Sequence, residues 1–282
     1  MQTVAVEAKI IELERWFAGA GRVVVALSGG VDSAVLAALA HRVLGENSLA
    51  VTAVSASLSS DELNGVRSLA SELSLNYREI STDEIDDPEY VQNAANRCYV
   101  CKSHLFSQLE PLAQAWDATV VVGTNLDDLG DYRPGLQAAE DFGVASPFVL
   151  CCVDKQMVRA IARAIGLDTV ADKPASACLA SRIPYGVPVT IQRLGAVERL
   201  EQFLHRLGLP IVRVRHHGDI ARIELPPEAF ASALSYREQI VVEAERLGFL
   251  YSTLDLGGFR SGSLNRVLEG ATGSEGDRQA MV

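Results

Sequence analysis

A glycine pair between two apolar segments constrains this chain more than any other feature. The hexapeptide SGGVDS at residues 28–33 follows an apolar run at 23–27 and precedes an apolar stretch at 33–44. The short run is typical of a buried strand and the longer stretch of a core helix. Glycine lets a backbone approach a ligand closely, and a helix start presents unpaired N–H groups with a partial positive charge. The junction is therefore predicted to bind an anion.

Each polar residue of the hexapeptide has an expected role. Gly29 and Gly30 expose the backbone, Ser28 and Ser33 add hydroxyl donors, and Asp32 is suited to hold Mg²⁺. The hexapeptide is neither a Walker A loop nor a dinucleotide-binding glycine loop. It resembles the PP-loop signature of ATP pyrophosphatases, which implies that ATP is cleaved between its α and β phosphates while the loop holds pyrophosphate. The alternative is an ordinary strand–helix turn.

Alternating strand and helix patterns extend this fold along the chain. Short apolar runs predict further strands at 49–55, 77–80 and 118–122. Their alternation with helices predicts an α/β fold, a parallel sheet of the PP-loop (adenine nucleotide alpha-hydrolase-like) type. Ligands in such folds bind at the carboxyl ends of the strands. Helices are expected at 4–18, 33–44, 59–73, 97–116 with a break or kink at Pro111, and 155–166.

The alternation stops at residues 171–188, where three prolines and a cysteine fall in a segment that fits neither helix nor strand. A smaller C-terminal α+β domain is predicted after it, with helices at 190–207 and 236–247 and strands at 211–215, 220–225 and 250–256. The expected parts are a PP-loop domain at 1–170, a catalytic cysteine loop at 171–188, a domain for substrate binding or oligomerisation at 189–268, and a disordered tail at 269–282.

A second polar element follows the strand expected at 118–122. Gly123, Thr124 and Asp127 stand at its carboxyl end, where a ligand pocket is expected. We predict that they contribute to the nucleotide site. The alternative is a helix cap rich in Asn and Asp.

The cysteines point to chemistry rather than to disulfides. There are five, at positions 98, 101, 151, 152 and 178, and an odd number argues against a disulfide framework. Cys178 lies between Lys173 and Arg182 in the irregular segment, and such cationic neighbours favour the thiolate. A small buried residue is the alternative for an isolated cysteine.

Five segments together carry a closer resemblance. They are residues 97–102, 123–125, 130–135, 173–186 and 213–217. With the phosphate loop they closely resemble the ATP-dependent sacrificial sulfur transferases (the LarE family), which act in biosynthesis of the nickel-pincer nucleotide cofactor. The resemblance runs from about residue 23 to residue 224, and the run ACLASRIPYG at 177–186 is its most specific part.

The resemblance implies a substrate and a reaction. The substrate would be a pyridinium biscarboxylic acid mononucleotide, adenylated on a ring carboxylate by ATP. Cys178 would then displace AMP and give up its sulfur by elimination, leaving a thiocarboxylate product and a dehydroalanine in the chain. A thiolate suits this role because it attacks activated acyl groups readily. The sequence does not identify the base for the elimination.

Further site residues follow from the same resemblance. Arg213 and Arg215 would hold the substrate's phosphate or carboxylates, since alternation places them on one strand face and guanidinium groups suit such anions. A solvated strand face is the alternative for that pair. Ser181 and Arg182 would line the substrate site, and Glu201 is a candidate metal-binding acid.

Some members of the family instead carry an iron–sulfur cluster on three cysteines and donate sulfur catalytically. Cys178 is the last cysteine of this chain, so a cluster would need Cys98 and Cys101 or the pair at 151–152. We favour the cluster-free version. A zinc site at Cys98 and Cys101 is not expected, because zinc needs about four ligands.

Composition limits the partners. The net charge of −11 disfavours a long nucleic-acid footprint, and no apolar run approaches the ~20 residues of a membrane span. The acidic, amphipathic N-terminus is unlike a secretory signal, so a cytoplasmic location is expected. Homo-oligomers are common in the family, and other cofactor-biosynthesis proteins are possible partners. The rival functions are a tRNA thiolase, an ammonia-using adenylating ligase such as NAD synthetase, and a nucleotide sensor resembling universal stress proteins.

Overall fold

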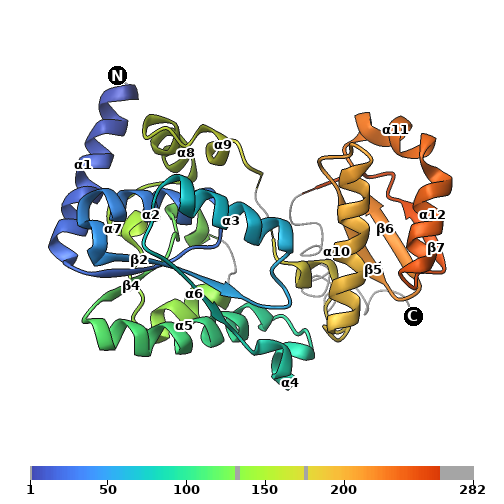
Figure 1. The fold of residues 1–282 in the computed structure, drawn as a ribbon, viewed down its shortest axis with the longest axis horizontal. Helices are drawn as coiled ribbons and strands as arrows, with labels where there is room; N and C mark the ends of the chain where they lie inside the picture. The colour runs from blue at the N-terminus through green and yellow to red at the C-terminus, as the bar shows by residue number, and fades with distance from the viewer. Residues whose placement is uncertain (1, 131–133, 175–176, 261–282) are drawn as a thin grey trace, which may run out of the picture. The chain divides into compact units, whose positions relative to one another are not determined.

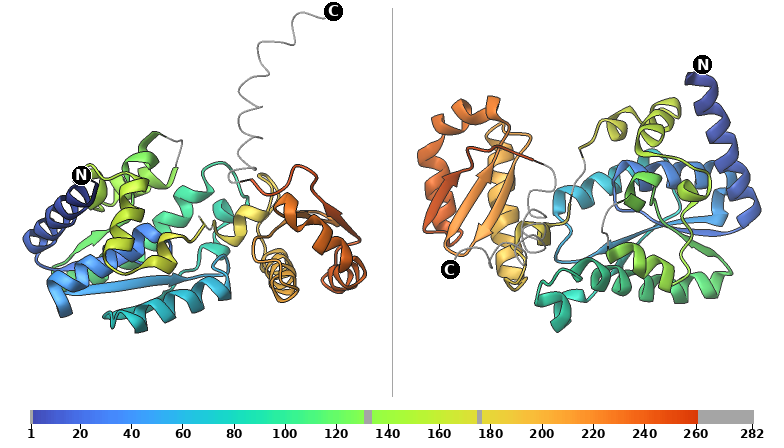
Figure 2. Two further views of the ribbon diagram at one scale, coloured as in Figure 1. Left: turned by 90° about the horizontal axis from the view of Figure 1, so that it is seen from above. Right: turned by 180° about the vertical axis from the view of Figure 1, so that it is seen from behind.

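The computed structural model describes residues 2–130, 134–174 and 177–260, which form two compact units (Figures 1 and 2). The first consists of Met1–Tyr90 and Asn96–Ser176, and the second of Val91–Ala95 and Ala177–Val282. The boundary near 176 falls within the segment expected to connect two domains. The tail predicted at 269–282 lies outside the described residues.

The first unit is built on a four-stranded parallel sheet with the order β3-β2-β1-β4. The strands are β1 (Val23–Ala26), β2 (Ser48–Val54), β3 (Tyr77–Ser81) and β4 (Thr119–Val121). Val23 and Val25 face one hydrophobic core while Val24 faces another, so both sides of β1 are buried. This is the burial that a parallel sheet requires, and it confirms the predicted α/β fold.

Helices cover both faces of this sheet (Figure 1). The described helices are α1 (Gln2–Ala20), α2 (Val31–Leu44), α3 (Ser60–Glu72), α4 (Pro88–Val91), α5 (Arg97–Trp116), α6 (Pro134–Asp141), α7 (Pro147–Leu150), α8 (Lys155–Ala164) and α9 (Asp168–Ala171). The first core lies against α1, α2 and α8, and the second against α5 and α6. The expected break at Pro111 is wrong, because α5 is one continuous helix with Leu109 and Ala113 buried on either side of the proline.

Strand register brings two loops together at one edge of the sheet. β1 lies between β2 and β4, and Val25 is level with Val121. Because the strands are parallel, the segments that follow β1 and β4 emerge side by side. The phosphate loop and the element beginning at Gly123 are therefore neighbours.

The second unit has the predicted α+β character. Its three-stranded sheet has the order β5-β6-β7, with β5 (Arg213–His217) antiparallel and β7 (Tyr251–Leu254) parallel to β6 (Ile220–Glu224). Its helices are α10 (Ile191–Arg206), α11 (Phe230–Ser235) and α12 (Arg237–Arg246) (Figure 2). The hydroxyl of Thr190 accepts the N–H of Arg193 at 3.3 Å and so caps α10.

The irregular segment is more ordered than its sequence predicts. Leu179–Arg182 forms a short 3₁₀ helix, so the expectation of neither helix nor strand is wrong there. The chain beyond it is held by the buried amide of Asn93, which donates to the carbonyls of Pro184 and Val187 at 2.8 Å each. This contact explains why residues near 93 belong to the second unit.

Candidate functional site

The backbone of the phosphate loop requires glycine at position 29. Gly29 has φ of +79°, and a Cβ there would lie 2.6 Å from Cγ2 of Val66. Gly30 precedes α2, and only Oγ of Ser28, at 3.7 Å, would come within 4 Å of a Cβ on it. The start of a 14-residue helix is thus open to an anion.

The two serines of the loop bind each other. The hydroxyls of Ser28 and Ser33 lie 3.1 Å apart, and Oγ of Ser33 also accepts the N–H of Ser28 at 3.1 Å. Oγ of Ser33 donates to the carbonyl of Gly30 at 3.1 Å. These bonds fix the curvature of the loop, and Ser33 is buried as a result.

Asp32 belongs to a closed ring of contacts among four residues. The amide of Asn125 donates to Asp32 at 3.1 Å, and Oδ1 of Asn125 accepts the N–H of Asp127 at 3.0 Å. A carboxylate oxygen of Asp127 accepts the N–H of Lys155 at 2.9 Å. The ammonium of Lys155 closes the ring by an ion pair with Asp32. Sequence reasoning gave no role to Lys155, because no local pattern links it to the loop.

The three residues expected to border the nucleotide after β4 lie in different surroundings. Asp127 accepts the N–H of the first residue of α8, as the alternative of a helix cap predicts. Thr124 is half-buried beside it. Gly123 lies so close to α2 that a Cβ on it would be 2.8 Å from Cβ of Asp32 and 2.9 Å from N of Ser33.

Lys173 is a second cation at the loop. Its ammonium donates to the carbonyl of Gly29 at 3.1 Å and forms an ion pair with Glu62 in the first turn of α3. The side chains of Lys173 and Glu62 are 31% and 23% exposed, so both can meet a ligand. The sequence singled out Lys173 only as a neighbour of Cys178.

The donor set around Asp32 fits magnesium only in company with phosphates. Among the described residues, no cluster of three His, Cys, Asp or Glu side chains could hold a metal. Mg²⁺ is commonly bound through one or two carboxylates together with substrate phosphates and water. Asp32, at the open end of α2, matches that mode.

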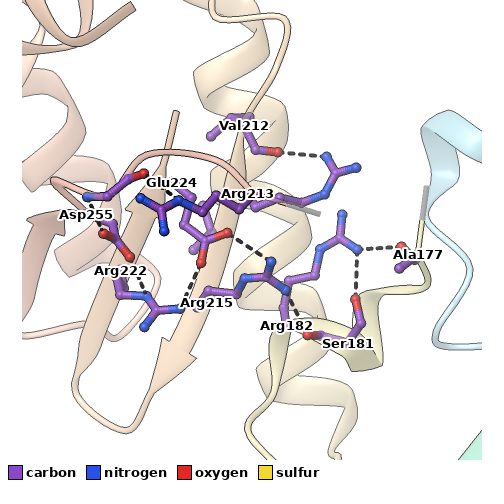
Figure 3. Close-up of polar contacts among 12 residues, drawn as sticks. Ala177, Ser181, Arg182, Val212, Arg213, Arg215, Arg222, Glu224 and Asp255 are labelled. Atoms are coloured by element: carbon purple, nitrogen blue, oxygen red, sulfur yellow. Dashed lines mark hydrogen bonds and ion pairs between the residues drawn. The ribbon is translucent and has the colours of Figure 1, made fainter. Parts of the chain in front are cut away.

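In the second unit, Arg182 organises the backbone around Cys178. Its guanidinium donates to the carbonyls of Ala177 and Cys178, the latter at 3.1 Å, and to Oγ of Ser181 at 3.2 Å (Figure 3). It also pairs through two bonds of 3.0 Å with Glu201, and Arg182 is only 3% exposed. The buried guanidinium of Arg182 therefore fixes the backbone turn at Cys178.

Glu201 has protein partners for its charge. Besides Arg182, it accepts the N–H of Val214 at 2.9 Å, and it is buried. These contacts compensate the charge of the Glu201 carboxylate without a metal, so we do not propose Glu201 as a metal ligand.

The arginines of β5 share one sheet face with residues of β6 (Figure 3). Arg215 binds buried Glu224 at 2.9 Å and the carbonyl of Ser181 at 3.0 Å, while Arg222 reaches Glu224 at 2.8 Å. Arg213 is half-buried, donates to the carbonyl of Val212 at 2.8 Å and lies over the ring of Phe259. Arg213 is thus more accessible to an anion than Arg215.

The pKa of His217 depends on the charges of this sheet face. Burial lowers the pKa of His217, and the neighbouring cations Arg222 and Arg215 lower it further. The imidazole is therefore neutral at physiological pH, and the positive charge of the face comes from its arginines.

The cysteines differ in accessibility. Cys178, Cys152 and Cys98 are exposed, Cys101 is half-buried, and Cys151 is buried. Burial raises the pKa of the Cys151 thiol. Cys178 immediately precedes the 3₁₀ helix, and its carbonyl accepts the N–H of Ser181 at 2.9 Å. An exposed thiol at a turn is open to a substrate.

The parallel sheet and the loop after β1 define a nucleotide-binding domain of the PP-loop class. Residues 7–99 match the NAD synthase family model. The chain is 46% identical over 266 residues to an uncharacterized protein of Synechocystis sp., covering 93% of this chain and 98% of the relative. It is 30% identical over 241 residues to an uncharacterized protein of Methanocaldococcus jannaschii, covering 85% and 91%.

A third relative identifies the family. The chain is 40% identical over 249 residues to the pyridinium-3,5-bisthiocarboxylic acid mononucleotide synthase of Lactiplantibacillus plantarum, covering 88% of this chain and 90% of the relative. The chain belongs to the same family, the LarE family of ATP-dependent sulfur transferases. In the part of the chain that the structure describes, no helix is long and apolar enough to cross a membrane.

Proposed function

We propose that the chain adenylates a carboxylate of a pyridinium biscarboxylic acid mononucleotide and converts it to a thiocarboxylate, in nickel-pincer cofactor biosynthesis. The observation that carries this proposal is the 40% identity to the bisthiocarboxylic acid mononucleotide synthase over nearly its whole length. The exposed Cys178 supports it, since the reaction needs an accessible sulfur. The NAD synthase family model, which bears on the rival ammonia-using ligase, matches only residues 7–99.

The phosphate loop would bind ATP. The open end of α2 and the backbone at Gly29 and Gly30 suit the β and γ phosphates. Asp32 would hold Mg²⁺, which neutralises phosphate charge when it is bound. Gly123 and Thr124 would border the nucleotide at the end of β4. A ring carboxylate oxygen of the substrate attacks the α-phosphorus, and pyrophosphate leaves.

Cys178 would then transfer its sulfur in two steps. Its thiolate attacks the acyl carbon of the adenylate and AMP leaves, which gives a thioester between substrate and protein. A base removes the Cα proton of Cys178, the Cβ–S bond breaks, and both electrons of that bond leave with sulfur. The product is a thiocarboxylate, and the chain keeps a dehydroalanine at position 178.

The second unit would bind the substrate. Arg213 is the accessible guanidinium for the substrate's phosphate or carboxylate, and Arg215 supplies charge from the same strand face. Ser181, three residues after Cys178, would line the substrate site with its hydroxyl. We further propose a cytoplasmic homo-oligomer, which size-exclusion chromatography with light scattering would test.

One observation favours a second candidate, in which a cluster-bound sulfur is donated and Cys178 survives. Cys98 and Cys101 lie three residues apart near the start of α5, and this spacing puts side chains on the same side of a helix. Both thiols are at least partly accessible. A cluster-bearing family member needs three cysteine ligands, and these two would supply two of them.

Mass spectrometry after a single turnover separates the two. The sacrificial route predicts the loss of one H₂S from the peptide containing Cys178, with Cys98 and Cys101 unchanged. Cys178→Ala should still release pyrophosphate but form no thiocarboxylate, whereas Cys152→Ala, which removes another exposed thiol, should behave as wild type. An intact Cys178 after turnover by protein that carries iron and sulfide would overturn the sacrificial route in favour of the cluster.

A further inference from the structure

Two lysines that are remote in sequence from the phosphate loop place their ammonium groups beside it. Lys155 begins α8 and pairs with Asp32, and Lys173 follows α9 and pairs with Glu62. Each ammonium thus rests against a carboxylate. Oxygens of these carboxylates occupy positions where phosphate oxygens would be equally suitable partners.

We propose that Lys155 and Lys173 are phosphate ligands, and that ATP binding exchanges their carboxylate partners for phosphate oxygens. The inference rests on the proposed binding of ATP at this loop. Lys155 would leave Asp32 for a phosphate oxygen, and Asp32 would then be available to hold Mg²⁺. Each group therefore exchanges one opposite charge for another.

Partial exposure to water keeps the free-energy cost of this exchange low. The side chains of Lys155 and Asp32 are 33% and 21% exposed, comparable to those of Lys173 and Glu62. Ion pairs that water reaches contribute little to stability. The pair of Arg182 with Glu201 is different, because its side chains are only 4% and 8% exposed and separation would leave buried charges uncompensated.

The position of Lys173 favours its exchange from Glu62 to a phosphate. Its ammonium already touches the carbonyl of Gly29, so a short movement of a flexible side chain brings it to a phosphate held by the loop. Glu62 competes with that phosphate for Lys173. Removing the charge of Glu62 should therefore strengthen phosphate binding, which is the opposite of what loss of a ligand does.

The test compares Lys155→Met and Lys173→Met with Lys9→Met, a lysine paired with Glu12 on α1 away from the loop. Calorimetry with Mg²⁺ measures binding of ATP, pyrophosphate and AMP to the full chain. Loss of one charge-assisted contact predicts about ten- to hundredfold weaker binding of ATP and pyrophosphate. Binding of AMP should change less than about threefold, and Lys9→Met should match wild type.

Glu62→Gln completes the test and should tighten pyrophosphate binding about two- to tenfold. Weaker binding in Glu62→Gln would overturn the exchange at Lys173. Equal losses for ATP and AMP in the lysine variants would show that these residues support the fold or the adenosine site. Wild-type protein that binds neither ATP nor pyrophosphate would overturn the proposed function too, whereas binding that survives in both lysine variants overturns only this inference.

Discussion

Replacing Gly123 by alanine should separate β4 from the phosphate loop. A Cβ at this position would lie 2.8 Å from Cβ of Asp32, 2.9 Å from C of Asp32 and 2.9 Å from N of Ser33. Two of these three atoms belong to the backbone of α2, so no side-chain rotation relieves the contact. The first turn of α2 and the end of β4 must therefore move apart.

The expected cost follows from two terms. Forcing one methyl group into a packed contact costs about 1–3 kcal/mol. The movement also weakens the 3.1 Å bond from Asn125 to Asp32, which contributes about 1 kcal/mol. The free energy of unfolding of the first unit should fall by about 2–4 kcal/mol. If about 1.4 kcal/mol of this is felt at the phosphate site, affinity for ATP falls tenfold.

Urea unfolding followed by tryptophan fluorescence measures this change selectively, because both tryptophans, Trp16 and Trp116, lie in the first unit. Gly65→Ala is the matched control. Gly65 lies inside α3 with no atom within 4 Å of its added Cβ, so alanine there should stabilise the helix by up to about 1 kcal/mol. Wild-type stability and ATP affinity in Gly123→Ala would refute the close approach of β4 to the loop.

Four further outcomes are expected. Asp32→Asn should abolish pyrophosphate release while circular dichroism shows a folded chain, and near wild-type adenylation would remove Asp32 from the mechanism. Arg213→Ala should weaken binding of the substrate more than that of ATP; Arg215→Ala should also destabilise the second unit by about 3–5 kcal/mol in thermal unfolding, because it leaves buried Glu224 with less compensation. Burial lowers the pKa of His104, but hydrogen bonds to two aspartates raise it overall above 6.5, so its stabilisation is full below pH 6.5 and is lost as pH rises through the raised pKa. Urea midpoints of His104→Gln against wild type should converge over that range, and a gap that widens with pH would contradict the ion pair.

Local patterns in the sequence predict the elements well because each element follows from neighbouring residues. Ser59, a residue type that favours helix starts, caps the helix predicted at 59–73, since its Oγ accepts the N–H of Glu62. The glycine pair likewise predicts the turn after β1. Lys155 and Asn93 could not be found in this way. Their partners lie 123 and about 90 positions away, and only the folded chain brings them together.

Arginine shows a second limit of sequence reasoning. Arg182, Arg213 and Arg215 all belong to segments that resemble the sulfur transferases, and each was expected to bind substrate. A guanidinium that serves a buried Glu and one that awaits a ligand have the same sequence signal, because both need the same planar fork of donors. Burial separates them: Arg182 and Arg215 are committed to Glu201 and Glu224, while Arg213 is half-buried and bonded to a backbone carbonyl. Arg213 is the less buried of the two arginines of β5, so an anion reaches it more easily. Arg215→Lys, which keeps the charge beside Glu224 but loses the fork, should therefore lower substrate affinity less than Arg213→Ala.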